Sequence, residues 1–242
     1  MNSSCPHSRS NRTGFLRGVS RGIAFFFGGF SLLNLLGESI HPGFDATIWW
    51  ANLRPLPDWV AMPFLLLAAV SLLTVSVRGE IRSRPIRMVF LATMLTLIFT
   101  SARDAVSFYR LLADGEIAAS FPFSFSVFVG FSLVLVVVGT WHRQATGEER
   151  AKTSRREKLA FASSLALWMA GFPLLQIHCF GWTDYRRPAD VAIVFGCRVY
   201  RSGALSPPLA DRVRSACQLY EQGLVRHLIM SGGPGMGDVH ET

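Results

Sequence analysis

Residues Trp59–Val77 read WVAMPFLLLAAVSLLTVSV and carry no charged side chain over 19 positions. A helix that crosses the hydrocarbon core of a bilayer needs about 20 mainly apolar residues, because it must satisfy its own backbone hydrogen bonds where there is no water. The composition agrees, since half of the 242 residues are hydrophobic, mean hydropathy is +0.32 and 17% are charged. A soluble domain usually carries about 25% charged residues. The stretch therefore predicts a membrane-spanning helix in a membrane protein.

Four further apolar runs indicate an α-helical polytopic region of about five spans within residues 22–183, behind an N-terminal arm of residues 1–21. The predicted spans are residues 22–37, 59–77, 88–102, 119–141 and 159–181. The third has 15 uncharged residues, so we expect Arg87 and Arg103 to extend toward the lipid headgroups for it to cross.

Two of these runs have another interpretation. Residues 119–141 are rich in Phe and Val, as a buried strand would be, but strands seldom exceed about ten residues. The basic N-terminus before the first run resembles a secretory signal, yet no A-x-A cleavage site follows it, and we expect an uncleaved first helix.

Lysine and arginine predict the orientation, because cytoplasmic loops retain an excess of them. The N-terminal arm and the loops 78–87 and 142–158 hold 14, whereas the intervening loops hold 3. The N-terminus is therefore predicted to be cytoplasmic and, after five crossings, the C-terminal segment extracytoplasmic. Tryptophan favours the headgroup zone, and most tryptophans fall at predicted span ends: Trp49, Trp50, Trp59 and Trp182 outside and Trp141 inside.

Few polar groups interrupt the spans. We find no carboxylate at a predicted midplane, which argues against a proton-coupled transporter. Asn34, Ser71 and Thr74 suit interhelical hydrogen bonds. The net charge of +8 is dispersed between apolar runs, so we predict no nucleic-acid partner. The four cysteines form no CxxC pair and no zinc-ligand spacing, and no metal site is predicted.

The character of the chain changes after Pro188, and residues 188–242 predict the start of a parallel sheet. Residues Ala189–Phe195 form a short apolar run typical of a strand buried on both faces. A helix is expected between Ser206, as N-cap before Pro207, and Gly223. A second strand follows, and its order predicts a βαβ unit. The residues expected on the apolar face of the helix are Leu209, Val213, Ala216 and Tyr220, and those of the second strand are His227–Met230.

A glycine-rich loop, Ser231–Gly237, follows the second predicted strand, and Asp238 with Glu241 has the spacing of a capping box. Such a loop presents backbone N–H groups to an anion at the carboxyl edge of a sheet, where α/β folds bind ligands. It lacks the G-x-G-x-x-G spacing, and a tight turn remains the alternative. Arg198 and Arg201, in the loop after the first strand, suit phosphate or carboxylate binding or simple solvation.

Residues 189–242, ADVAIVFGCRVYRSGALSPPLADRVRSACQLYEQGLVRHLIMSGGPGMGDVHET, resemble the opening of the bacterial YdcF/SanA/ElyC-like domain, most closely the SanA type. The features that match are the strand closed by Gly196, the loop Tyr200–Gly203, Arg212 in its helix, and Ser231–Gly233 ahead of Glu241. The match covers under a quarter of the chain, and the family domain has further strands and helices, so we expect a truncated Rossmann-like segment.

The resemblance implies a membrane-anchored domain that faces the periplasm and serves cell-envelope barrier function and cell-wall precursor metabolism. Our leading hypothesis is an inner-membrane envelope protein whose segment binds a phosphate-bearing or nucleotide-like ligand. The predicted ligand-binding residues are Gly196, Arg198, Arg212, Ser231, Gly232 and Gly233, with Glu241 as the candidate acid or base. A non-catalytic membrane scaffold and an inactive truncated fragment are the alternatives. The sequence identifies no cofactor and leaves enzymatic activity open; the bilayer is the one partner it predicts directly.

Overall fold

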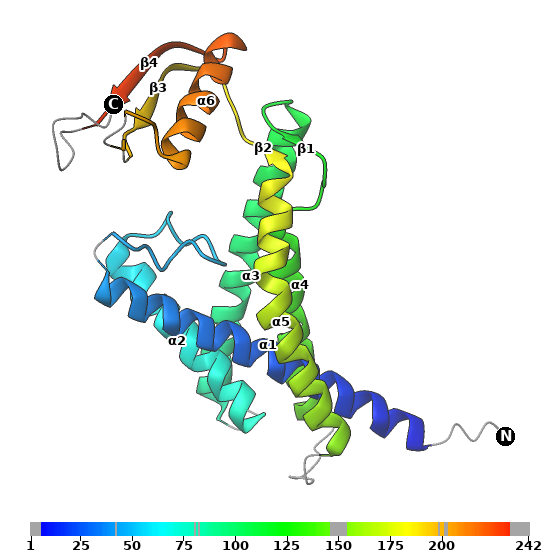
Figure 1. Cartoon of the computed structure of the whole chain (residues 1–242). Coiled ribbons are helices and arrows are strands. Elements are labelled where there is room, and N and C mark those ends of the chain that lie inside the picture. The colour runs from blue at the N-terminus through cyan, green and yellow to red at the C-terminus, as the bar shows by residue number, and fades with distance from the viewer. Residues whose placement is uncertain are drawn as a thin grey trace. The chain divides into compact units, whose positions relative to one another are not determined.

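The computed structural model of the chain describes residues 6–41, 43–79, 81, 83–145, 154–197, 199–200 and 203–232. It divides into two units, Met1–Ala113 with Ala119–Thr183 and Asp114–Ala118 with Asp184–Thr242. The first unit contains five helices and the second a small α/β element (Figure 1). The helices are α1 (Pro6–Ile40), α2 (Asp58–Arg78), α3 (Arg84–Ala113), α4 (Phe125–Ala145) and α5 (Arg155–Gly181), and two-residue strands β1 (Ala118–Ala119) and β2 (Thr183–Asp184) lie near the boundaries of the units.

Four of the helices are long and apolar enough to cross a membrane, namely Gly14–Ile40 of α1, α2, α3 and α5. The chain is therefore a multi-pass membrane protein. Helix α4 is also apolar, but its apolar stretch, Phe125–Trp141, is shorter than the other four. The described residues thus contain four helices long enough to span, against the five predicted, and α4 is a fifth, shorter apolar helix.

The boundaries of α1, α3 and α4 differ most from the prediction. Helix α3 has 30 residues rather than 15, because Arg87, Arg103 and Arg110 are good helix formers and a charge does not end a helix. Helix α4 starts at Phe125 rather than at residue 119, since Pro122 precedes it and restricts the residue before it to an extended conformation. Helix α1 begins at Pro6, so much of the N-terminal arm is helical.

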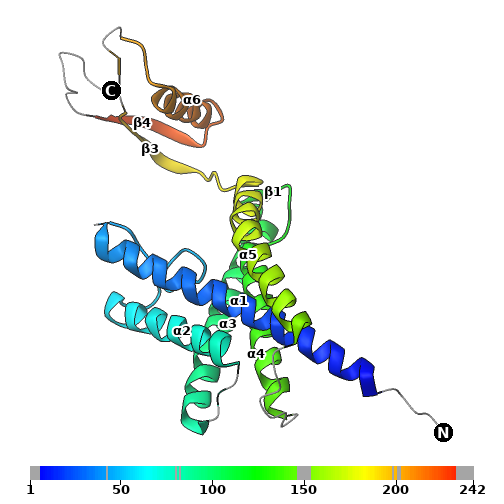
Figure 2. The same cartoon turned by 60° about the horizontal axis from the view of Figure 1, so that its bottom comes forward.

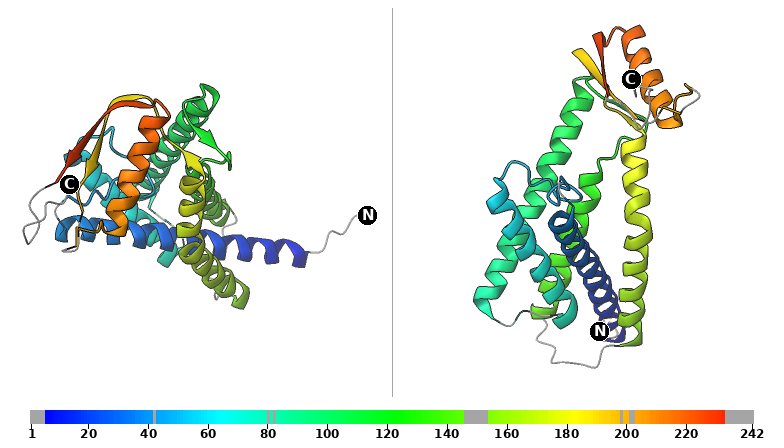
Figure 3. Two further views of the ribbon diagram at one scale, coloured as in Figure 1. Left: turned by 45° about the horizontal axis from the view of Figure 1, so that its top comes forward. Right: turned by 60° about the vertical axis from the view of Figure 1, so that its left-hand side comes forward.

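Helix α1 lies at the centre of the first unit. It contacts α2, α4 and α5, and Figure 3 (right) shows it between α2 and α5. It runs beside α2 and crosses α5 (Figure 2). The contacts that hold the unit together are therefore mainly contacts of its first helix.

Small residues allow α1 to approach α5 closely. A methyl group built on Gly18 would lie 2.5 Å from the Glu157 carbonyl oxygen and 2.6 Å from Ala160 Cβ, and one on Gly22 would lie 2.7 Å from the Phe161 carbonyl oxygen. Both glycines face α5 because a spacing of four residues returns to the same side of a helix. Small residues at this spacing are the usual means of close helix packing in membranes, where apolar side chains gain little by leaving lipid.

The same device holds α4 and α2 against α1. A methyl on Gly139 of α4 would lie 2.5 Å from Ser20 Cβ, and one on Gly28 of α1 would lie 3.1 Å from the Ala69 carbonyl oxygen of α2. Three helices thus meet α1 at glycine contacts.

A polar junction ties together one end of the bundle. Arg21 Nη1 donates to Glu157 Oε1 at 2.8 Å, and Arg21 Nε donates to the Ser76 carbonyl oxygen at 2.7 Å. In return, Ser76 Oγ donates to the Arg21 carbonyl oxygen at 2.9 Å. Glu157 also belongs to the capping box of α5, where its N–H donates to Ser154 Oγ at 3.2 Å. Helices α1, α2 and α5 are therefore fixed at this end by charge-assisted hydrogen bonds.

The loop between α1 and α2 packs into the bundle. Trp50 is buried, its ring centroid lies 4.8 Å from that of Phe27, and its Nε1–H donates to Ser31 Oγ at 3.1 Å. The side chain of Trp50 therefore packs inside the bundle rather than against lipid, because its indole N–H has a partner on α1 and its ring an aromatic neighbour.

The second unit is the predicted βαβ element: β3 (Ala189–Phe195), α6 (Pro207–Glu221) and β4 (Val225–Ser231), with the two strands parallel. Strand β4 is three residues longer than predicted. Leu209 and Ala216 of α6 are buried, as predicted. Tyr220 is exposed, and Leu219 faces the sheet in its place. The reason is geometric, since residue i+3 can stay on a narrow contact stripe where residue i+4 turns away from it.

The close packing of α1 on α5 yields a matched pair of substitutions. We expect Gly18→Ala to destabilise the protein by about 1–3 kcal/mol, because its methyl group meets backbone atoms that cannot move aside. In Gly29→Ala, on the same helix, the new methyl group has no atom within 4 Å. We expect this change to stabilise the protein by about 0.5–1 kcal/mol, because alanine loses less conformational entropy on folding than glycine does. Thermal unfolding of the full chain in detergent measures both, and equal stabilisation by the two changes would contradict the close contact.

Candidate functional site

The carboxyl ends of the two parallel strands lie together, as the sequence predicts. Phe195 pairs with Ser231 in the register of β3 and β4, and the Gly196 N–H donates to the Ser231 carbonyl oxygen at 2.5 Å. Gly232 follows directly. Three of the predicted ligand-binding residues, Gly196, Ser231 and Gly232, therefore share one edge of the sheet, where α/β proteins bind their ligands.

Arg212 joins this edge from α6. Its Nη1 donates to the carbonyl oxygens of Phe195 and Gly196 at 3.1 and 3.0 Å. A guanidinium has five N–H donors, and these two bonds use one of its three nitrogens. Arg212 thus fixes the helix to the end of β3, which is a structural role that the sequence reading, with Arg212 as a charge partner for a ligand, did not include.

The remaining predicted site residues, Arg198, Gly233 and Glu241, lie outside the described residues. In the described part of the loop between β3 and α6, the Tyr200 N–H donates to the Ala204 carbonyl oxygen at 2.9 Å. Gly203 has a φ of +78°, a conformation that favours glycine. The role of Glu241 as acid or base stays a prediction.

A hollow of about 420 Å³ runs between β3 and α6 in the second unit. Ala192 and Val194 form its apolar side, and Asp211 and Arg212 its polar side. Asp211 accepts a hydrogen bond from Arg214 at 2.8 Å. The hollow extends to the end of β3 at Phe195, so it is continuous with the edge that carries the predicted residues.

The face of the two-stranded sheet opposite α6 is apolar and exposed. Adjacent positions in a strand point to opposite faces, and paired residues of parallel strands share a face. Ile193 pairs with Ile229, and both side chains are about half exposed. Phe195, on the same face, is 66% exposed. Helix α6 therefore covers one face of the sheet, and the opposite face is exposed in the part of the chain that the structure describes.

One carboxylate with a strongly shifted pKa precedes the amino end of β3, at the opposite end of the strand from this edge. The Arg186 guanidinium, hydrogen-bonded to Asp184 at 2.8 Å, lowers the pKa of Asp184 from its ordinary 3.8 to about 2. This carboxylate stays ionised well below neutral pH and suits ion pairing better than proton donation. Among the described residues, no group of three or more His, Cys, Asp or Glu side chains is placed to hold a metal ion.

Two polar residues in the spans behave differently from the expectation of interhelical hydrogen bonds. Thr74 Oγ1 donates to the Val70 carbonyl oxygen of its own helix at 2.7 Å. Asn34 is buried, and its Nδ2 has no hydrogen-bond partner. The contacts at Gly18 and Gly22 were also missed, although the four-residue spacing of Gly14, Gly18 and Gly22 is legible in the sequence.

No protein-family model, no curated protein and no solved structure matches this chain.

The two arginines of α6 provide a test of the edge. Arg212→Ala should accelerate amide hydrogen exchange at the end of β3 about fivefold or more, because two carbonyl groups lose their donor. Arg214→Ala, whose guanidinium bonds the exposed Asp211 on the same helix, should leave that exchange unchanged. Hydrogen exchange followed by mass spectrometry on the full chain in detergent measures both, and equal effects of the two changes would rule out a specific role for Arg212.

Proposed function

We propose that the chain is a five-span protein of the bacterial inner membrane that maintains the cell envelope, with its N-terminus in the cytoplasm. Its extracytoplasmic α/β segment binds a phosphate-bearing or nucleotide-like ligand at the carboxyl edge of β3 and β4. The observation that carries the proposal is the meeting of Gly196, Ser231 and Arg212 at that edge.

Contacts at both ends of α4 support a fifth crossing. Near its start, the rings of Phe125 and Phe180 lie 5.8 Å apart, and Phe180 is close to the end of α5. Near the other end, Gly139 contacts Ser20, the residue before Arg21 in α1, and Arg21 pairs with Glu157 at the start of α5. Helix α4 therefore covers much the same length as α5 in the opposite direction, and α5 is long enough to cross.

The distribution of charge supports the orientation. The Arg21 junction joins α1 to the end of α2 and the start of α5. The three basic segments of the sequence, which hold 14 Lys and Arg residues, border this same end. Positive charge near span ends marks the cytoplasmic side.

The chemistry of the edge supports an anionic ligand. Backbone N–H groups in a glycine-rich loop after a parallel strand suit phosphate oxygens, and arginine binds such oxygens in a bidentate manner. The resemblance of residues 189–242 to the YdcF/SanA/ElyC-like domain points to the same edge and to the same envelope role. Catalysis is not part of the proposal.

A non-catalytic scaffold is the second candidate, and a specific observation favours it. Val191, Ile193, Phe195 and Ile229 form an exposed apolar face on the sheet. Such faces in soluble segments mark sites of protein interaction. In this alternative, the segment would bind a protein through the face rather than a small ligand at the edge.

Single-cysteine variants test the topology. Five crossings put Cys5 and Cys217 on opposite sides of the membrane, and Cys217 is exposed on α6. We expect a membrane-impermeant maleimide to label Cys217 in intact spheroplasts and to label Cys5 only after lysis, with the other cysteines changed to serine. Labelling of both residues in intact spheroplasts, or of neither residue before lysis, would indicate an even number of crossings and overturn the proposed topology.

Titration of the purified full chain in detergent tests the ligand, with ADP and inorganic phosphate as separate probes. We expect saturable binding of at least one probe, weakened about tenfold or more by Arg198→Ala because a charge-assisted hydrogen bond is lost. Arg214→Ala is the matched control, since it removes the same charge from the exposed side of α6. Absence of saturable binding for both probes would leave the scaffold as the better proposal.

A further inference from the structure

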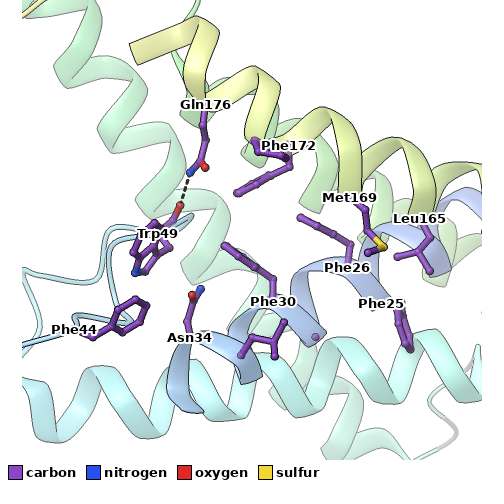
Figure 4. Close-up of a pocket in the computed structure, with 13 residues that line it drawn as sticks. Phe25, Phe26, Phe30, Asn34, Phe44, Trp49, Leu165, Met169, Phe172 and Gln176 are labelled. Carbon is purple, nitrogen blue, oxygen red and sulfur yellow. Dashed lines mark hydrogen bonds between the residues drawn. The ribbon is translucent and has the colours of Figure 1, made fainter. Parts of the chain in front are cut away.

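A cavity of about 510 Å³ lies between α1, α5 and the loop that precedes α2, all within the first unit. Figure 4 shows the side chains that line it. Helices α1 and α5 touch at Gly18 and Gly22, and the cavity begins beyond this contact, along residues 25–34 of α1 and 165–176 of α5. Its size is within the range of small-ligand pockets, about 300–1,000 Å³.

The interior of the cavity is aromatic and its rim faces the lipid. Phe172 is 2% exposed, and its ring lies 5.1 Å from Phe26 and 5.2 Å from Phe30. At the rim, Leu33 and Met169 are 65% and 64% exposed. Both belong to membrane-spanning helices, so in the bilayer their exposed sides meet hydrocarbon. The cavity is thus accessible to a molecule dissolved in the membrane.

The polar side-chain groups of the lining are two amides and the indole N–H of Trp49, and none of the lining residues is charged. Gln176 Nε2 donates to the Trp49 carbonyl oxygen at 2.9 Å and closes the top of the cavity in Figure 4. Asn34 is 5% exposed, points toward the cavity, and its Nδ2 has no hydrogen-bond partner. A buried N–H2 group without an acceptor is costly and rare in folded proteins.

The missing acceptor has a restricted chemistry. Water is a poor candidate because a buried water needs two to four polar partners, and apolar cavities stay dry. A phosphate is excluded by the absence of a cationic side chain in the lining, since a buried anion requires a counter-charge. The remaining choice is a neutral oxygen joined to a long apolar chain.

We propose that this cavity binds a membrane glycerophospholipid, with one acyl chain against Phe26, Phe30 and Phe172 and its ester carbonyl accepting a hydrogen bond from Asn34 Nδ2. The phosphate stays outside, toward the headgroups. The site is independent of the proposed ligand edge in the α/β unit, and no covalent step is involved.

Gly29→Leu is the sharpest test because it fills the site and leaves the protein contacts alone. Gly29 lines the cavity, and a methyl built on it has nothing within 4 Å. Native mass spectrometry of the full chain in detergent, titrated with phosphatidylglycerol, should show binding of the first lipid weakened about tenfold or more. Gly171→Leu is the control, since Gly171 does not line the cavity and its nearest neighbour is Leu167 Cδ1 at 3.9 Å.

Asn34→Leu keeps the shape and removes the donor, so we expect about fivefold weaker binding of the diacyl lipid. A dialkyl ether lipid with the same headgroup lacks the carbonyl and should bind wild type and Asn34→Leu equally. Thermal unfolding of each variant confirms that it is folded. Wild-type affinity in Gly29→Leu, or equal loss in Gly171→Leu, would show that the retained lipid only coats the bundle and would overturn the proposal. The same holds if Asn34→Leu weakens diacyl and ether lipids alike.

Discussion

The approach of the α1 backbone to its neighbours is the constraint on which the rest of the membrane unit depends. Apolar side chains are solvated as well by lipid as by one another, so helices in a membrane gain stability from close packing and polar contacts. At Gly18 and Gly22 there is no room for a side chain. The contact places Arg21 within reach of Glu157 and the end of α2. It also brings α1 and α5 together at one end, while the cavity occupies the space between them beyond it.

Polar contacts then fix what the glycine contacts bring together. One end of the bundle has the Arg21 junction, and further along α1 the Trp50 indole bonds Ser31 while Gln176 bonds the same loop at Trp49. The bond between Trp50 and Ser31 is buried, where an unmade hydrogen bond is costly. Asn34 differs from these residues, because it is buried and its amide N–H2 has no hydrogen-bond partner.

The sequence predicts those features that depend on local pattern and misses those that depend on contact. The apolar runs predict the helices, and the strand, helix, strand order predicts the parallel pair that brings Gly196 to Ser231. The start of α4 also has a local cause in Pro122, but a span predicted from the length of the apolar run alone starts too early, at residue 119. By contrast, the sequence does not predict the burial of Trp50, because its partners, Phe27 and Ser31, are distant in sequence. Nothing in the hydropathy of Arg212 indicates that it bonds the end of β3, since that geometry exists only after α6 packs.

The order in which the chain is made gives the central helix an unusual history. Helix α1 precedes its partners in the chain, and two of them, α4 and α5, are made only after α2 and α3. Its glycine surface therefore remains in lipid, or against the insertion machinery, until more than a hundred further residues have been synthesised. Contacts between such distant segments form slowly, because the entropy of closing a long loop is lost before the contacts contribute any stability. The surroundings of α1 are thus complete only after α5 has been made and inserted.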